Sequence, residues 1–321
     1  MVSLTRFKGN PILRPDPAKP FMEFAAFNPA AVELGGRVYI LFRAQDYDLT
    51  STIALVELPD GFTVTYVSDE PIYRPREPFE SRILGGFGPA GCEDPRVTVL
   101  DGRLYMLYTA VSDAYDYVRV VMTSIDVDSF LKRRWSAWSR PRPISPPGVW
   151  DKNAAILPRR VQGRYVVLHR FFPNVWIDFV EDLEFEGYWI RGYEFFRVRP
   201  GMWDSDRVGI AGPPLEFNEG WLMIYHAKSS QDGAYRLGAA LLDREDPTIV
   251  ISRLDYPILE PREWYETEGI HVVFSCGHVV LDGKLLVYYG ASDKYLAVAY
   301  IGVDELLGEL LKRSSSFNPN H

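Results

Sequence analysis

Residues 100–113, LDGRLYMLYTAVSD, combine a turn glycine, a run of alternating aromatic and aliphatic residues, and a polar end. The same order recurs in four other stretches: ELGGRVYILFRAQD (33–46), VQGRYVVLHRFFP (161–173), FNEGWLMIYHAKS (217–229) and LDGKLLVYYGASD (281–293). Intervals of 57 to 66 residues separate the repeated glycines, which are Gly36, Gly102, Gly163, Gly220 and Gly283. Five similar units at a period of about 60 residues indicate a repeat architecture.

Each unit has room for about four short strands and their turns, and little of it has a helical pattern. Four-stranded sheets repeated around an axis form a β-propeller. We therefore predict an all-β fold, a five-bladed β-propeller in which residues 1–321 form a single domain. A β-sandwich with accidental repeats is the alternative. A short C-terminal helix is expected over residues 303–313, with Asp304 as its N-cap, before a loose tail at residues 314–321.

The composition limits the classes of partner. The chain of 321 residues has 47% hydrophobic and 24% charged residues and a formal net charge of −8. An acidic chain is a poor ligand for nucleic acid, whose phosphates need a basic face. It contains neither the long apolar run of a membrane helix nor the apolar segment of a secretory signal. Its two cysteines, Cys92 and Cys276, cannot build a disulfide framework or a zinc site, so we expect a cytoplasmic protein without metal.

Polar residues recur at fixed distances from the repeated glycine. Asn28 and Asp94 lie eight residues before it, Arg43 and Arg170 lie seven residues after it, and Asp293 lies ten residues after it. In a propeller the inner strands of all blades converge on one axial funnel, so residues at equivalent positions should face one another. The carboxylate, amide and guanidinium groups of this set suit a hydroxyl-rich ligand such as a sugar.

A second set of polar residues is basic and consists of Lys152, Arg170, Arg207 and His226. Such groups would repel one another at the funnel unless an anion lay among them. Arginine side chains match phosphate oxygens with two parallel hydrogen bonds, so phosphate is a suitable anion. The alternative is that each basic residue pairs with a carboxylate, as Arg207 could with Asp206.

Ten short motifs occur together in one order: FNPA, LFRAQD, GCEDPR, KNAAILP, LHR, VGIAGPP, GWLMIYH, LGAALLD, YETEGI and VYYGASD. With them the chain resembles glycoside hydrolase family 130, the β-mannoside phosphorylases and related β-mannosidases, over nearly its whole length. The resemblance also implies a five-bladed propeller. It makes Asp94, in EDPR, the general acid, and it gives the other matched residues two roles. Mannose would be held by Asn28, Arg43 and Asp293. Phosphate would be held by Lys152, Arg170, Arg207, His226 and Tyr235.

The resemblance thus implies an enzyme, an inverting glycoside phosphorylase that needs inorganic phosphate as co-substrate and no cofactor. Phosphate would replace the aglycone of a β-manno-oligosaccharide, with a β-1,2 linkage preferred, to give α-mannose 1-phosphate. Because phosphate is itself a nucleophile, the site needs a cationic clamp instead of a general base. Family members often assemble, so a homo-oligomer is also expected.

Three other functions remain open from the sequence. A β-mannosidase would share the fold but carry acidic residues at the anion site, and a non-catalytic propeller would only bind carbohydrate. A furanosidase would need a carboxylate triad in successive blades, and the basic residues of the third and fourth repeats count against it. Glu93 also has two interpretations. It would raise the pKa of Asp94 if both faced the funnel, with Arg96 opposing this, but neighbours on a strand usually point to opposite faces.

Overall fold

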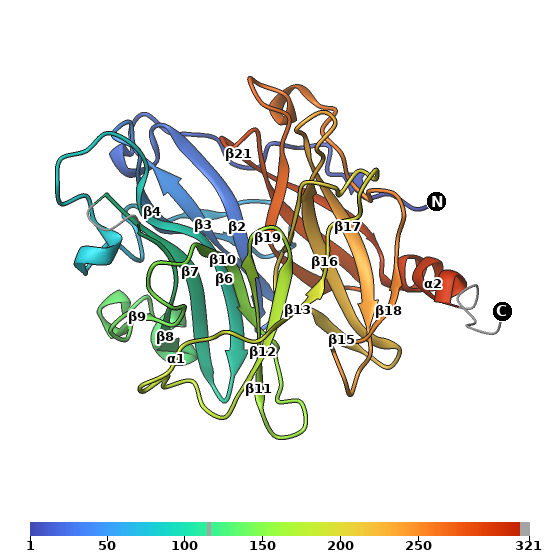
Figure 1. The fold of residues 1–321 in the computed structure, drawn as a ribbon. Coiled ribbons are helices and arrows are strands. Elements are labelled where there is room, and N and C mark those ends of the chain that lie inside the picture. Colours follow the sequence, from blue (N-terminus) through green and yellow to red (C-terminus); the bar gives the residue numbers. More distant parts are fainter. Residues whose placement is uncertain (114–116, 315–321) are drawn as a thin grey trace.

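The computed structural model describes residues 1–113 and 117–314, which fold mainly into β-strands (Figure 1). Two α-helices are present in this part of the chain, α1 (Val127–Leu131) and α2 (Val303–Ser314). Single 3-10 turns occur at η1 (Pro20–Met22), η2 (Pro78–Glu80), η3 (Trp135–Ala137) and η4 (Trp264–Glu266). The nearly all-β class and the C-terminal helix are therefore confirmed, whereas the short α1 was not predicted. Asp304 is not the N-cap of α2, because the helix already begins at Val303 and Asp304 lies in its first turn. Of the predicted tail, residues 315–321 lie outside the described residues.

The largest sheet has eight strands and contains the first two sequence repeats. Its strands are β2 (Ala25–Leu34), β3 (Arg37–Gln45), β4 (Thr50–Leu58), β5 (Tyr66–Val67), β6 (Ala90–Leu100), β7 (Arg103–Ser112), β8 (Tyr117–Asp126) and β9 (Arg142–Pro143). A parallel pairing of Thr50 with Ala90 and Ser51 with Gly91 joins the two four-strand groups. Glycine permits this close approach, since a Cβ on Gly91 would lie 2.1 Å from the Ser51 carbonyl oxygen. Separate sheets for these repeats, as a propeller predicts, are thus not observed.

The third and fourth repeats form one sheet each. The third contains four strands: β10 (Asp151–Ile156), β11 (Tyr165–Phe171), β12 (Val175–Val180) and β13 (Tyr193–Phe196). The fourth contains five strands: β14 (Arg207–Ile210), β15 (Leu215–Phe217), β16 (Gly220–Lys228), β17 (Tyr235–Leu242) and β18 (Val250–Arg253). All strand pairings within these two sheets are antiparallel.

The last sheet joins the two ends of the chain. It contains β19 (Val273–Leu281), β20 (Lys284–Ala291) and β21 (Tyr295–Gly302), and β1 (Thr5–Arg6) pairs with β21 as its fourth strand. The N-terminal segment therefore completes the sheet formed by the final repeat. Next to it, α2 buries Leu306, Leu307 and Leu310, while Leu311 stays exposed.

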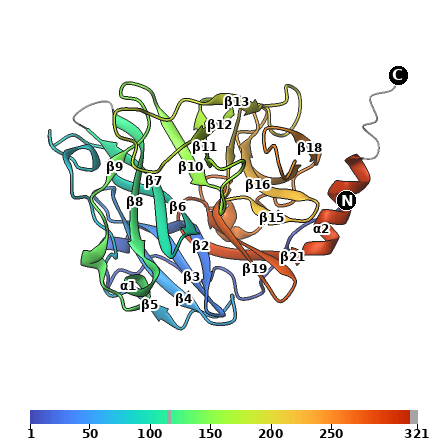
Figure 2. The same ribbon diagram turned by 90° about the horizontal axis from the view of Figure 1, so that it is seen from below.

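The first strands of the repeats pack against one another near the middle of the molecule (Figure 2). β2 contacts β6 and β19, and β10 contacts β6 and β14. This packing brings segments from five distant parts of the sequence together. Buried Val, Leu, Ile and aromatic side chains fill the space between the sheets. No described helix is long and apolar enough to cross a membrane.

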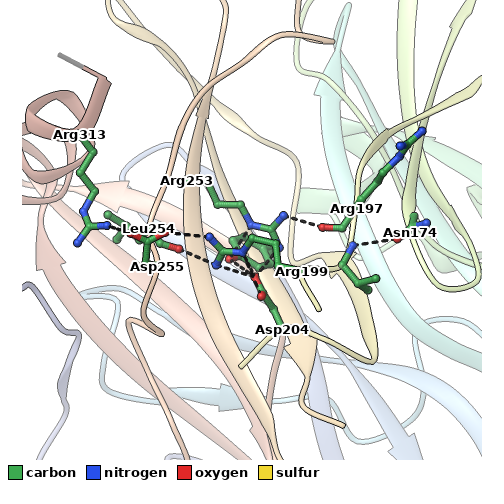
Figure 3. A network of polar contacts seen from close by, with 10 residues as sticks. Asn174, Arg197, Arg199, Asp204, Arg253, Leu254, Asp255 and Arg313 are labelled. Atoms are coloured by element: carbon green, nitrogen blue, oxygen red, sulfur yellow. Dashed lines mark hydrogen bonds and ion pairs between the residues drawn. The ribbon is translucent and has the colours of Figure 1, made fainter. Parts of the chain in front are cut away.

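A polar network fixes the segment that leads into β14 (Figure 3). The fully buried carboxylate of Asp204 accepts hydrogen bonds from Arg199, at 2.8 Å, and from Arg253 and Tyr225. Arg199 also contacts Asp255, which binds Arg313 of α2. These contacts connect the segment before Arg207 to the fourth sheet, through Arg253, and to the C-terminal helix, through Asp255 and Arg313.

Candidate active site

One pocket of about 500 Å³ collects most of the residues singled out by the sequence. Eight of the nine predicted site residues line it: Asn28, Arg43, Asp94, Lys152, Arg170, Arg207, Tyr235 and Asp293. The pocket is also lined by residues that were not assigned to the site: Glu93, Trp150, Asn153, Phe172, Val272 and Phe274. Trp150 and Phe172 are 62% and 61% exposed, so they form its aromatic rim.

A repeated β-bulge aims side chains into this pocket. The pairing register shifts between Phe27 and Ala30 in β2, between Glu93 and Arg96 in β6, and between Lys152 and Ala155 in β10. The bulged residues Asn28, Asp94 and Asn153 have φ values of 47°, 53° and 55°. Asparagine and aspartate adopt this left-handed conformation more readily than other side chains, and a bulge redirects the strand locally. The identity of these residues therefore suits both the backbone and the pocket.

The bulge in β6 explains why two neighbouring carboxylates face the same guanidinium. Arg43 Nη2 lies 2.8 Å from Glu93 Oε1, and Arg43 Nη1 lies 3.3 Å from Asp94 Oδ1. Asn28 Nδ2 donates a 2.8 Å hydrogen bond to the same Asp94 oxygen. Of the two interpretations of Glu93 that the sequence left open, the one in which it faces the pocket with Asp94 therefore holds, since strand alternation fails at the bulge.

The charges around Asp94 hold its carboxyl in the ionised form. Burial acts to raise its pKa, but Arg43, Lys152 and the hydrogen bond from Asn28 outweigh burial and lower the pKa below its usual value. Repulsion by Glu93 therefore does not dominate. Asp293 behaves in the opposite way. Its side chain is open to the pocket, but the surrounding protein removes much of the water from the carboxyl group. This desolvation, together with the negative charges of Asp94 and Glu93, outweighs the attraction of Arg43 and raises the pKa of Asp293 to about 6.

Lys152, Arg170 and Arg207 form a basic wall of the pocket, and carboxylates neutralise only part of its charge. Lys152 Nζ lies 3.4 Å from Glu93 Oε2, and Arg207 Nε lies 2.8 Å from Asp206 Oδ2. The pairing of Arg207 with Asp206 that the sequence left open is therefore present.

Arg170 differs from both, because no described carboxylate forms an ion pair with it. Its Nη1 is buried and has no hydrogen-bond partner among the described residues. Burial, together with the positive charges of Arg207 and Arg96, lowers its pKa. Arg170 therefore lines the pocket as a cation that no described carboxylate neutralises, which suits an anion-binding site.

His226 is the predicted site residue that does not line the pocket. It is fully buried behind the wall, with Nε2 3.1 Å from Asn153 Nδ2 and its ring 4.0 Å from that of Phe274. Burial, with Arg96 and Arg170 nearby, lowers its pKa well below the usual value, so the ring is neutral. Direct contact of a cationic His226 with phosphate is not what this geometry provides. The ring instead supports Asn153 from behind.

Asn153 shows how the comparison of offsets missed a site residue. It occupies the same bulged position as Asn28 and Asp94, but its repeat glycine, Gly163, follows ten residues later instead of eight. The available signal was the residue type at the bulge: an Asn or Asp that precedes Pro in the first two repeats, and Asn153 that precedes Ala in the third. Among the residues the structure covers, no group of three or more His, Cys, Asp or Glu side chains is arranged to hold a metal ion.

Comparisons with known proteins find relatives over nearly the whole chain. A family model described as beta-1,4-mannooligosaccharide phosphorylase matches residues 6–313. The chain is 34% identical to the 1,2-beta-oligomannan phosphorylase of Thermoanaerobacter sp. (strain X514), over 95% of this chain and 99% of that protein. It is also 34% identical to the beta-1,2-mannobiose phosphorylase of the same organism, over 94% of this chain and 98% of that protein.

A solved structure of one relative has a similar fold over nearly the whole chain. The beta-1,2-mannobiose phosphorylase of Listeria innocua, in complex with beta-1,2-mannobiose, superimposes with a TM-score of 0.81 at 26% identity. The match covers 96% of this chain and 99% of that one.

Proposed function

The chain belongs to glycoside hydrolase family 130, and from this premise we propose that it is an inverting β-mannoside phosphorylase acting on β-1,2-linked manno-oligosaccharides. Inorganic phosphate is the co-substrate and no cofactor is required. The β-1,2 linkage is preferred over β-1,4 because the relatives at 34% identity are named for β-1,2 substrates, although the family model is described by a β-1,4 activity.

The position of Arg170 in the pocket wall is the observation that carries this proposal. Its guanidinium lines the pocket and forms no ion pair with a described carboxylate, so a phosphate in the pocket would supply the missing negative charge. Lys152, Arg207 and Tyr235 line the same pocket and would contribute further donors. On the other side, Asn28, Arg43 and Asp293 would hold the mannosyl ring.

In the proposed reaction a phosphate oxygen attacks the anomeric carbon of the mannosyl group. The bond from this carbon to the aglycone oxygen breaks, and the oxygen receives the proton of Asp94. The products are α-mannose 1-phosphate and a shortened sugar, with inverted configuration. Phosphate also helps to load the acid: its negative charge beside Lys152 offsets one of the charges that lower the pKa of Asp94 in the empty pocket.

One observation favours hydrolysis as a second candidate. Three carboxylates, Glu93, Asp94 and Asp293, line the pocket, and an inverting hydrolase uses one carboxylic acid and one carboxylate base. In this site, however, Glu93 is engaged by both Arg43 and Lys152 and is not free to activate water.

Three further features complete the proposal. The five repeats form the blades of a five-bladed propeller in one domain over residues 1–321, with the first two blades hydrogen-bonded to each other. The two cysteines are buried and unpaired, as a reducing cytoplasm allows. We also propose a homo-oligomer, on the ground that members of the family often assemble.

The experiment is turnover of β-1,2-mannobiose by the purified protein with and without inorganic phosphate, followed by ³¹P NMR. Strict dependence on phosphate, with α-mannose 1-phosphate as product, is the expected result. Equal release of free mannose in both conditions would reject phosphorolysis in favour of hydrolysis.

A further inference from the structure

Arg96 lies directly beneath the pocket and connects three strands. It is 1% exposed, and it is the first residue of β6 that pairs with β7 again after the bulge. Its Nη1 donates to the Asp94 carbonyl at 2.9 Å, and its Nη2 lies 3.2 Å from Asn153 Oδ1 in β10. Its Nε donates to the carbonyl of Ala211 at 2.7 Å, and Nη2 also reaches the Ile210 carbonyl at 3.1 Å, at the end of β14.

All four acceptors of this guanidinium are neutral. No direct ion pair joins Arg96 to a carboxylate in the described part of the chain: its hydrogen bonds go to amide and peptide oxygens, and the Asp94 carboxylate acts on its charge only from a distance. Burying a charge in this way is expensive unless every donor is satisfied. Such an arrangement is hard to explain as packing alone, because an apolar side chain would fill the same space at lower cost.

The contacts of Arg96 join the two halves of the site. One acceptor belongs to the residue that carries the proposed acid, and another is the side chain of the bulged Asn153 on the anion side. We propose that Arg96 is a positioning residue whose planar guanidinium fixes the bulges of Asp94 and Asn153 against β14, so that the acid and the phosphate site keep one mutual geometry. This inference rests on the proposed phosphorylase function.

The surroundings of Asn153 also support this role of Arg96. A Cβ on Gly209 would lie 2.5 Å from both Asn153 Nδ2 and His226 Nε2. Glycine at this position therefore leaves room for Asn153 to be held between Arg96 and His226. A lysine in place of Arg96 would keep the charge but could not reach acceptors on three strands with one rigid fork.

The first test compares Arg96→Lys with Arg253→Lys, a matched exchange in the Asp204 network away from the pocket (Figure 3). For Arg96→Lys we expect kcat to fall and KM for phosphate to rise at least tenfold, with KM for mannobiose changed less than threefold. The rise in Tm caused by phosphate should shrink in parallel. Arg253→Lys should lower Tm and change either KM less than threefold, because Arg199 still binds Asp204 and holds the segment before Arg207. A wild-type KM for phosphate and an unchanged thermal shift in Arg96→Lys would overturn the inference.

The second test leaves every charge in place. Gly209→Ala displaces Asn153, and Gly238→Ala serves as its control in the same sheet, because the added Cβ would lie 2.4 Å from the Tyr225 ring instead. KM for phosphate should rise at least fivefold in Gly209→Ala alone, and an equal effect in both variants would contradict the proposed tie. If wild-type protein turns over without phosphate, the proposed function fails. If wild-type protein needs phosphate and both Arg96→Lys and Gly209→Ala resemble it, only the role of Arg96 fails.

Discussion

Replacing Arg170 by methionine separates anion binding from sugar binding. The exchange keeps an apolar stem of similar length but removes the guanidinium whose Nη1 has no partner among the described residues. A hydrogen bond to a charged group contributes about 1.5–3 kcal/mol. At about 1.4 kcal/mol per factor of ten, its loss should raise KM for phosphate roughly 10- to 100-fold. KM for mannobiose should change less than threefold, since the proposed mannose ligands lie on other strands.

The same exchange has a second, opposite effect on stability. In the phosphate-free protein Arg170 is partly desolvated beside Arg207 and Arg96, which is why its pKa is lowered. Arg170→Met should therefore leave the phosphate-free Tm unchanged or raise it, while phosphate should no longer increase Tm.

Initial rates over a matrix of phosphate and mannobiose concentrations, with differential scanning fluorimetry, measure both effects. The control is Arg164→Met, which removes an arginine that stacks on Phe179 in the same sheet outside the pocket. A folded Arg170→Met protein with KM for phosphate within threefold of wild type would refute the assignment of the anion site.

Three further predictions concern the sugar side. Asp94→Asn should lower kcat on mannobiose at least 1,000-fold while the protein still binds the sugar, and a variant with more than a tenth of wild-type turnover would exclude Asp94 as the acid. The pKa of Asp293 is raised to about 6, above the usual 3.8, so the folded state holds its proton more tightly and loses stability as pH rises from about 4 to 6. Asp293→Asn should therefore raise Tm more at pH 7 than at pH 4, and a larger gain at pH 4 would contradict this sign. In Gly290→Ala the new Cβ would lie 2.2 Å from Asn28 Oδ1, so KM for mannobiose should rise while phosphate still shifts Tm as in wild type, and a rise confined to KM for phosphate would count against Asn28 as a sugar ligand.

Much of the fold was predictable because the repeats are visible as a repeated turn glycine and strand. The same register correctly brought Asn28 and Asp94 into one pocket, where they share a hydrogen bond. The joining of the first two repeats into one sheet was not predictable. It depends on a short parallel pairing of Thr50 and Ser51 with Ala90 and Gly91, and this pairing has no counterpart between the other repeats that a sequence pattern could reveal.

The parts of the site that the sequence did not resolve have local physical causes. Glu93 faces the pocket because a bulge interrupts the alternation of the strand, and alternation alone does not predict a bulge of one residue. His226 was placed in the basic set by its residue type, but its ring is buried against Asn153 and Phe274 and does not line the pocket. Its contact with phosphate stays a prediction.

The central claim is that phosphate lies between the basic wall and the sugar, across from Asp94. A crystal structure of the protein with phosphate and mannose measures this directly. We predict a phosphate oxygen within hydrogen-bonding distance of the Arg170 guanidinium, with Asp94 on the opposite side of the mannose ring. A pocket that holds mannose while Arg170 stays without an anion, and a carboxylate orients a water molecule toward the anomeric carbon, would contradict the account.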